Sequence, residues 1–349
     1  MLIRCLIALL SLAAALRAEP TAPIKVKVVI LAMFEVGDDT GDKPGEFQFW
    51  VEREKLDRVI PLPAAYHPVR ANADGSVIGI VTGMGNIRAA ATVMALGLDP
   101  RFDFSQAYWL VAGISGADPH DVSVGSAVWA DWVVDGDLGH EIDAREKPAE
   151  WSTGYFPFMR KAPYEQPRKE QNIGEAYQLD PGLVDWAYAL TKDTSLEDSA
   201  GLKEKRALYA GLPNAQTPPR VLKGATLSAL TFWHGALLNE WANRWVAYHS
   251  EGRANYMTSA MEDTGTLQAL TWLARAGKAD VRRALVLRTA SNYDMQWPGA
   301  TAEQSINGED HAAYSGYMPS LEAAHKVGSQ VVHALLKDWD RYATELPKP

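Results

Sequence analysis

Short apolar runs alternate with amphipathic segments along most of this chain. Apolar runs of roughly five to ten residues are typical of strands that are buried on both faces of a sheet. Such runs predict strands at 24–33, 76–82, 107–112, 126–135, 221–230 and 283–289. Amphipathic segments predict helices at 46–57, 86–98, 183–191, 236–249, 261–276 and 320–345. Strands that alternate with helices indicate an α/β fold with a mainly parallel sheet covered on both faces.

The alternation weakens between residues 136 and 219. This stretch is rich in proline, tyrosine, tryptophan and charged residues. No segment of the chain has the composition of a linker, and no repeat period is visible. We therefore expect a single domain over residues 24–345, with 136–219 as an elaborated middle region within it.

The N-terminal residues have the three parts of a secretory signal peptide. Arg4 provides a positive charge, residues 5–16 are apolar, and Ala18 is a small residue before a Glu-Pro break. The apolar run is shorter than the roughly 20 residues that cross a bilayer, although an uncleaved anchor is the alternative. We expect residues 1–18 to be removed and the mature protein to be exported, either periplasmic or secreted. The only cysteine, Cys5, lies in this segment, so the mature chain has no thiol chemistry.

The charge of the chain restricts its partners. Its formal net charge is −9 at pH 7, which disfavours binding to nucleic acid or to an anionic membrane surface. No segment after the signal peptide has the roughly 18 uninterrupted apolar residues of a spanning helix. We therefore expect a protein that does not span the membrane.

Glycines and polar side chains follow four of the predicted strands. The first segment carries Glu35 and Glu46, and the other three are 82–86, 112–116 and 290–294. In open parallel sheets, ligands bind in the loops at the carboxyl ends of the strands. A single glycine pair after a strand is usually only a turn. Four such segments on one edge of a sheet predict a ligand site.

Several segments, in the same order along the chain, resemble the nucleoside phosphorylase and nucleosidase superfamily. They are 82–92 (TGMGNIRAAAT), 111–135, 259–270 (SAMEDTGTLQAL) and 287–295 (LRTASNYDM). Together with 33–53, 140–151 and 232–235, they resemble the purine nucleoside permease family, a branch of that superfamily. The resemblance covers nearly the whole mature chain. It implies a three-layer nucleoside phosphorylase-like fold, with a mostly parallel central mixed sheet flanked by helices.

The resemblance assigns the sugar and base contacts. Glu262 would accept hydrogen bonds from the ribose hydroxyls, and Met261 would pack against the sugar. A solvated acid at a helix start is the structural alternative for Glu262. Asn292 stands where most superfamily members carry an Asp that protonates the purine, and an amide cannot deliver a proton. Asp294 would then be the acid, or only a turn residue.

The same resemblance indicates where the attacking group lies. Ser115 and the backbone amides from Gly113 to Gly116 match the loop that meets phosphate or water. Glu46 is the candidate for positioning water, and Glu35 is the alternative. Phosphorylases normally hold phosphate with a basic residue near this loop, and here the preceding residues, 109–111, are not basic. Arg88 could substitute, although an arginine on an exposed helix is usually only solvated. We therefore expect hydrolysis or binding alone rather than phosphorolysis.

Three consecutive residues are candidates for contacts with the base. Phe232 and Trp233 would stack on the purine, although core packing explains one of them equally well. His234 would contact the base or the ribose, although a lone histidine is more often structural.

A second group of polar residues lies in the middle region, at Asp137, His140, Glu141 and Asp143. It matches no recognised metal motif. A polar network or an oligomer contact is therefore preferred to a metal site.

The resemblance implies an exported purine nucleoside-binding protein with a role in nucleoside uptake. Its site would cleave the N-ribosidic bond as a nucleosidase or a phosphorylase, without a cofactor other than phosphate as co-substrate. The alternative is a weak or inactive binding protein that only assists uptake. Without a spanning helix, transport would require a membrane partner. Superfamily relatives are commonly oligomeric, so a homo-oligomer is expected.

Overall fold

The computed structural model describes residues 22–165, 174–308 and 316–349. The expected signal peptide, residues 1–18, lies outside the described residues. Within the described ranges, every helix is too short or too polar to cross a membrane.

Ten strands form one mixed sheet at the centre of the molecule. Their order is β11-β8-β12-β13-β7-β2-β5-β4-β3, and β14 pairs with both β7 and β8. The bounds are β2 Val28–Ala32, β3 Arg58–Ile60, β4 Val69–Ala71, β5 Val77–Val81, β7 Tyr108–Ala117, β8 Ala127–Asp135, β11 Ala176–Gln178, β12 Val221–Ser228, β13 Tyr256–Ala260 and β14 Ala284–Tyr293. Because β14 joins β7 to β8, the strands β7, β14, β8, β12 and β13 close into a ring.

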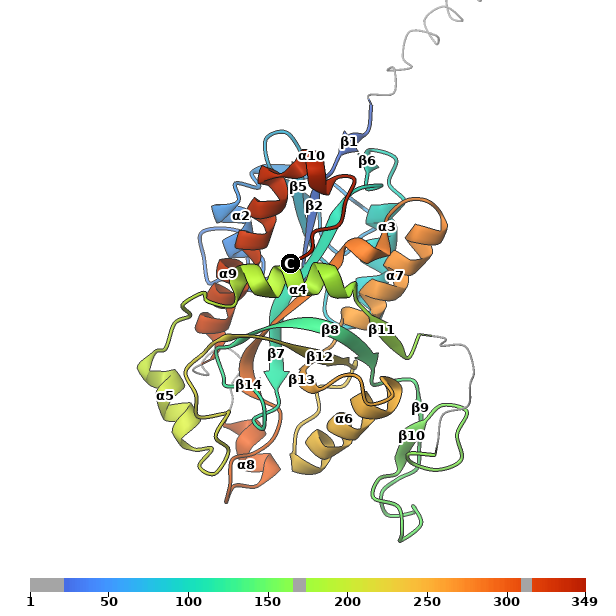
Figure 1. Cartoon of the computed structure of the whole chain (residues 1–349), viewed down its shortest axis with the longest axis vertical. Helices are drawn as coiled ribbons and strands as arrows, with labels where there is room; N and C mark the ends of the chain where they lie inside the picture. Colours follow the sequence, from blue (N-terminus) through green and yellow to red (C-terminus); the bar gives the residue numbers. More distant parts are fainter. Residues whose placement is uncertain (1–21, 166–173, 309–315) are drawn as a thin grey trace, which may run out of the picture.

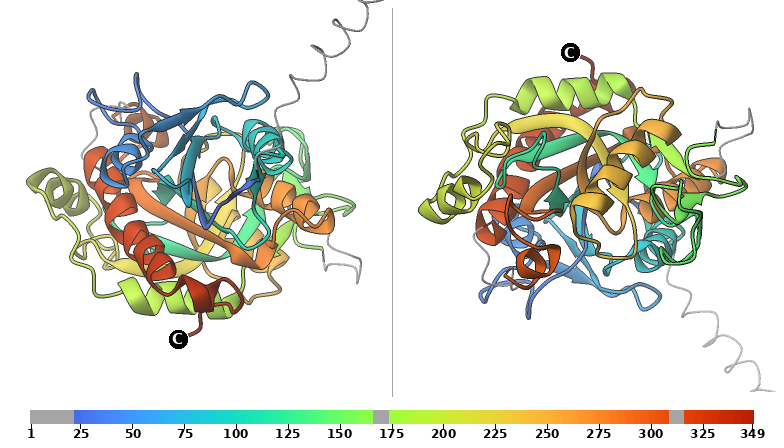
Figure 2. Two further views of the ribbon diagram at one scale, coloured as in Figure 1. Left: turned by 90° about the horizontal axis from the view of Figure 1, so that it is seen from above. Right: turned by 90° about the horizontal axis from the view of Figure 1, so that it is seen from below.

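Helices cover both faces of this sheet. The bounds are α2 Gln48–Arg53, α3 Asn86–Gly97, α4 Pro181–Thr191, α5 Ala200–Ala207, α6 Ala236–His249, α7 Asp263–Arg275, α8 Ala302–Asn307, α9 Tyr317–Lys337 and α10 Trp339–Tyr342, with a 3-10 turn at Val281–Arg283. Helix α9 packs on β7 and β14, whereas α3 and α7 pack together on the other side, as Figure 1 and Figure 2 show. The expected three-layer arrangement is confirmed.

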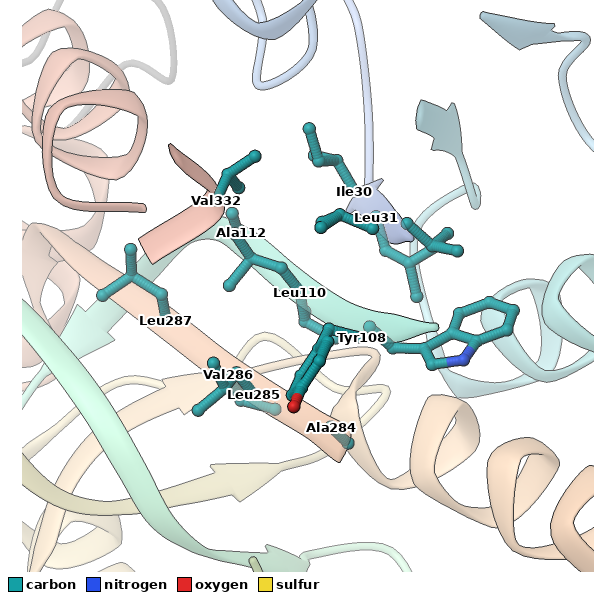
Figure 3. Packing of buried hydrophobic residues seen from close by; sticks show 14 of the residues in the cluster. Ile30, Leu31, Tyr108, Leu110, Ala112, Ala284, Leu285, Val286, Leu287 and Val332 are labelled. Atoms are coloured by element: carbon teal, nitrogen blue, oxygen red, sulfur yellow. The ribbon is translucent and has the colours of Figure 1, made fainter. Parts of the chain in front are cut away.

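The core lies where β2, β7 and β14 meet helix α9. Figure 3 shows side chains of these elements in one cluster, among them Ile30, Leu110, Leu287 and Val332. All four are almost fully buried. Strands buried on both faces need apolar side chains in both directions, which is why these segments are continuous apolar runs rather than alternating ones.

Two small pairs of strands lie outside the main sheet. Strand β1 (Ile24–Lys25) pairs with β6 (Phe102–Asp103), and β9 (Gly139–Glu141) pairs with β10 (Tyr155–Pro157). The β9–β10 hairpin stands away from the main body in Figure 1. It belongs to the stretch 136–219, in which the sequence pattern weakens.

Two of the four predicted loops are wrong, because the strands continue through them. Strand β7 runs to Ala117 and β14 runs to Tyr293, and the two are paired in parallel over this stretch with a bulge between Ala290 and Asn292. The glycines of β7 serve close packing rather than a turn. A Cβ atom at Gly113 would lie 2.5 Å from a carboxylate oxygen of Glu46, so a larger residue there would displace the Glu46 side chain.

Candidate functional site

A cavity of about 580 Å³ opens where the ends of β2, β7, β13 and β14 converge. Most of its lining is apolar. The polar side chains deepest in the fold are Glu46, Ser115, Glu262, Arg288, Ser291 and Asn292, all at most a few per cent exposed. Segments that are far apart in the sequence therefore supply one site, at the sheet edge where α/β proteins bind ligands.

Glu262 lies at the start of α7 and faces this cavity. Its Oε1 accepts a 3.0 Å hydrogen bond from the backbone amide of Gly85, and its Oε2 lies 3.0 Å from Nη2 of Arg288. Burial raises the pKa of Glu262, and the Arg288 cation opposes that shift. With only 4% of the residue exposed, Glu262 is not the solvated helix-start acid that the sequence left as an alternative.

The structure places the two candidate acids after β2 in different environments. Glu46 lines the cavity, where its carboxylate accepts hydrogen bonds from the amides of Met33 (2.8 Å) and Ile114 (2.7 Å). Burial raises the pKa of Glu46 to about 8, against the effect of Arg288. Glu35 does not line the cavity, and its carboxylate accepts hydrogen bonds from the amides of Phe47 and Gln48 at the start of α2. Glu35 stabilises a helix terminus, and Glu46 faces the site.

Asn292 and Ser115 lie on the paired strands β14 and β7, where Asn292 is opposite Gly116 and Ser115 is opposite Ala290. The amide nitrogen of Asn292 donates to the Tyr293 carbonyl at 3.1 Å, and its amide oxygen lies 3.0 Å from the Ser291 hydroxyl. A carbonyl can only accept, so this contact fixes which end of the amide is the donor. Ser115 donates to the Thr289 carbonyl at 3.3 Å. Asn292 and Glu262 line the same cavity, as the proposed nucleoside contacts require.

Asp294 lies behind Asn292, beside a small annex of about 30 Å³ that shares Phe232, Met261 and Asn292 with the main cavity. One carboxylate oxygen accepts from Asn239 at 3.0 Å, and the other is bonded to the Tyr256 hydroxyl. Burial, together with the nearby charge of Asp118, raises the pKa of Asp294 far above its ordinary value. Burial thus favours the neutral form of Asp294, and the hydrogen bonds from Tyr256 and Asn239 oppose this effect.

Two residues of the site were not predicted from the sequence. Arg288 is 1% exposed, and both Nε and Nη2 donate to the carboxylate of Asp263, at 2.5 to 3.2 Å. Its Nη1 donates to the Ile114 carbonyl at 3.2 Å. A charged residue directly after the apolar run 284–287, within a strand predicted to be buried, was the available signal, since a buried arginine requires a charged partner.

The cation beside the Ser115 strand is therefore Arg288 and not Arg88. In the parallel pairing of β14 with β7, Arg288 lies opposite Gly113. Arg88 does not line the cavity, and its Nη1 donates to the carbonyl of Met84, which precedes α3. The expectation that only Arg88 could supply a cation here is wrong, because the sequence does not show which strands are neighbours.

The three predicted base contacts separate in the structure. Phe232 is about half exposed and lines the main cavity. Trp233 lines the annex and packs edge-on against Trp241. His234 lines neither space; burial lowers its pKa to about 4, and its Nε2 has no hydrogen-bond partner within the described part of the chain. Of these three residues, only Phe232 lines the main cavity and could stack on a ligand there.

The four polar residues of the middle region, 137–143, lie on the β9–β10 hairpin and in the segment just before it, and they do not form one cluster. Asp137 accepts from the Leu230 amide at 2.9 Å, His140 stacks on Phe158, and Asp143 is paired with Arg145 at 2.7 Å. Among the described residues, no group of three or more His, Cys, Asp or Glu side chains is arranged to hold a metal ion.

Comparison with models of known protein families shows which family this chain belongs to. The family model described as purine nucleoside permease (NUP) matches residues 25–347. The chain belongs to the purine nucleoside permease family. A purine nucleoside permease of Candida albicans is 28% identical over 328 residues, which are 93% of this chain and 78% of the relative. A probable purine nucleoside permease of Schizosaccharomyces pombe is 26% identical over 294 residues, 80% of this chain and 82% of the relative.

Solved structures confirm the fold of this permease-family protein. A 5′-methylthioadenosine/S-adenosylhomocysteine nucleosidase of Neisseria meningitidis superposes with a TM-score of 0.51, at 14% identity, over 89% of this chain and 100% of that one. A futalosine hydrolase of Helicobacter pylori gives a TM-score of 0.50 at 15% identity, over 88% of this chain and 98% of that one. The permease-family chain thus has a nucleosidase-type fold, as its sequence motifs imply.

Proposed function

We propose that this protein is an exported purine nucleoside-binding protein whose cavity also cleaves the N-ribosidic bond. One observation carries the proposal: Glu46, Glu262 and Asn292, from three distant segments, line one cavity. The family's name refers to purine nucleosides, and the superposed structures are of enzymes named as nucleosidases or hydrolases. The proposal assigns one part of the nucleoside to each of the three side chains.

The ribose would lie against Glu262 and Met261. A carboxylate accepts two hydrogen bonds from a vicinal diol, and both residues line the cavity. Gly85 and Arg288 hold the Glu262 carboxylate from behind, so its orientation is set before the sugar arrives. A carboxylate that is already held in place reduces the entropy lost when the ligand binds.

The purine would lie between Phe232 and Asn292. The half-exposed ring of Phe232 offers an apolar face to the base. The Asn292 amide has one N–H left after its contact with the Tyr293 carbonyl, and N7 of a purine is an acceptor. A hydrogen bond at N7 would stabilise the charge that the base gathers as the bond to the ribose breaks.

Glu46 would act on the attacking group. Its carboxylate accepts hydrogen bonds from Met33, just after β2, and from Ile114 on β7, the strand that also carries Ser115. A carboxyl whose pKa is raised by burial is a stronger base once it ionises, which suits removal of a proton from the attacking oxygen. Cleavage of the nucleoside would then release a free purine base.

A binding protein without turnover is the second candidate, and Asn292 is the observation that favours it. An amide cannot protonate the leaving base. The carboxyl of Asp294, two residues further on, is already hydrogen-bonded to Tyr256 and Asn239. In this alternative, the protein would hold nucleosides outside the cytoplasm and pass them to a membrane partner.

Incubation of the purified mature protein with inosine, guanosine and adenosine distinguishes the two candidates. Chromatography would detect the free base, and calorimetry would detect nucleoside binding. Free base that appears in proportion to the amount of protein supports cleavage. Binding without a free base supports the second candidate, and the absence of both contradicts the proposal. Export is tested separately by fractionating the host cells and sequencing the N-terminus of the mature chain.

A further inference from the structure

The hydrogen bonds of Arg288 limit what it can offer to a ligand. A guanidinium has five N–H groups. Nε and one N–H of Nη2 point to Asp263, the other N–H of Nη2 points to Glu262, and one N–H of Nη1 points to the Ile114 carbonyl. A single N–H therefore remains for the cavity. The bidentate fork that usually recognises phosphate is occupied by the protein's own Asp263.

The charges around Arg288 are also unfavourable for an anion. The carboxyl groups of Glu46, Glu262 and Asp263 surround this one buried cation, and each acts on it electrostatically. Asp263 is fully buried and makes its ion pair with Arg288 at 2.5 Å. Among the described residues that line the cavity, the only other basic one is Lys43, whose side chain is exposed. Even with Glu46 protonated, two carboxylates would face one guanidinium.

We infer that the attacking group in this site is water and that Asp263 is the residue that excludes phosphate. The inference rests on the proposed function and adds the choice of the second substrate. A phosphate beside Glu262 and Glu46 would bring two to three like charges together in a buried space, where repulsion is only weakly screened. Water carries no charge and needs one acceptor, which Glu46 provides.

The reaction is then a hydrolysis. The water oxygen forms a bond to C1′ of the ribose, and Glu46 takes one water proton. The C1′–N9 bond breaks, its electron pair goes to the purine, and the purine takes up a proton from solvent, while Glu46 releases the water proton to solvent and so returns to its starting form. The products are ribose and the free base, and no ribose 1-phosphate is formed.

The wild-type protein gives the first test. It would be incubated with inosine in buffers of equal ionic strength, with sodium phosphate or with sodium chloride, and the sugar product would be identified by mass spectrometry. Ribose as the only sugar product, at a rate that phosphate does not raise, supports the inference. Ribose 1-phosphate would overturn it.

The Asp263→Asn variant gives the second test, by calorimetric titration with inorganic phosphate. The neutral isostere removes one carboxylate from Arg288, so phosphate should bind at least about tenfold more tightly than to the wild type. Asp280→Asn is the matched control, because Asp280 also pairs with an arginine, Arg282, but lies away from the cavity. Equal phosphate affinity in the wild type and in a folded Asp263→Asn protein would overturn the role of Asp263.

These tests separate failure of the inference from failure of the proposed function. If inosine binds but is not cleaved, the cleavage part of the proposed function and the assignment of water as the attacking group fail together, and the titration with phosphate still decides whether Asp263 excludes phosphate. If Asp263→Asn does not fold, the wild-type titration decides it. Millimolar or tighter binding of phosphate to the wild type contradicts the inference, and no binding in that range supports it.

Discussion

The backbone amide of Gly85 donates a 3.0 Å hydrogen bond to the carboxylate of Glu262, a residue 177 positions further along the chain. Gly85 begins α3 and Glu262 begins α7, and these two helices pack together. Gly85 has a φ of 93°, a conformation that non-glycine residues rarely adopt. The position of the candidate ribose-binding carboxylate thus depends on the turn that enters another helix.

Replacing Glu262 tests the ribose assignment. Glu262→Gln removes the charge that strengthens hydrogen bonds to a diol, at a cost of about 1.5–3 kcal/mol. Nucleoside affinity should therefore fall about 10- to 100-fold, measured by calorimetry on protein whose thermal unfolding has been checked. Glu345→Gln, at an exposed carboxylate near the C-terminus, is the control and should bind like the wild type. Unchanged affinity in Glu262→Gln would remove the assignment.

The pH dependence of cleavage tests Glu46. Because burial raises the pKa of Glu46 to about 8, the group is mostly protonated at neutral pH and ionises as the pH passes through 8. Only the ionised form can take a proton, so kcat should rise with pH and level off above about 8. Glu46→Gln should lower kcat by about 100-fold or more and lose this rise. A variant with the wild-type pH profile would show that another group is responsible.

Replacing Asn292 with an aspartic acid tests whether cleavage is limited by the lack of a proton donor to the purine. Asn292→Asp is nearly isosteric, and the single O–H of a protonated aspartic acid could be directed to N7 of the base, at the cost of the contact that the amide now makes with the Tyr293 carbonyl. If the reaction lacks a proton donor at the base, single-turnover cleavage should become about 10- to 100-fold faster at acidic pH. Nucleoside affinity should change little. A slower variant with intact binding would indicate that the amide itself is the better group at this position.

The raised pKa of the buried Asp294 carboxyl predicts how the free energy of unfolding depends on pH. Its folded-state pKa is raised, mainly by burial, so the folded protein keeps a proton that the unfolded chain releases near its ordinary pKa of about 3.8. The contribution of Asp294 to stability is thus greatest at low pH and declines as the pH rises above that value. Relative to Asp294→Asn, the wild type should lose stability between pH 5 and pH 8, measured by urea unfolding. An equal difference at both pH values would contradict the assignment of a neutral carboxyl.

The sequence predicted the helices with clear amphipathic patterns and the strands with continuous apolar runs, but it did not predict the short, more polar strands. Helix α6 has the predicted bounds, since its apolar positions repeat at helical spacing between a glycine and a polar end. Strand β13 was not predicted, because a run such as Tyr256–Ala260 is too short and too polar to distinguish from a loop. The glycines near 113–116 were taken for a turn, although they allow β7 to approach Glu46.

The site residues that lie in recognised sequence motifs could be predicted from the sequence. Glu262 and Asn292 belong to segments that resemble a known superfamily, and both lie in the cavity. Arg288 and Asp263 lie in those same segments, but their pairing depends on which elements are neighbours in space. The choice between Glu46 and Glu35 also needed the fold, since it depends on which carboxylate binds the start of α2.

A crystal structure of the mature protein with a purine C-nucleoside, whose bond to the sugar resists cleavage, tests the central claim most directly. The account predicts the 2′ and 3′ hydroxyls within 3.2 Å or so of the Glu262 carboxylate, a usual hydrogen-bond distance, and the N7 edge of the base at Asn292. A nucleoside bound elsewhere, or bound in the cavity with its sugar away from Glu262, would contradict it.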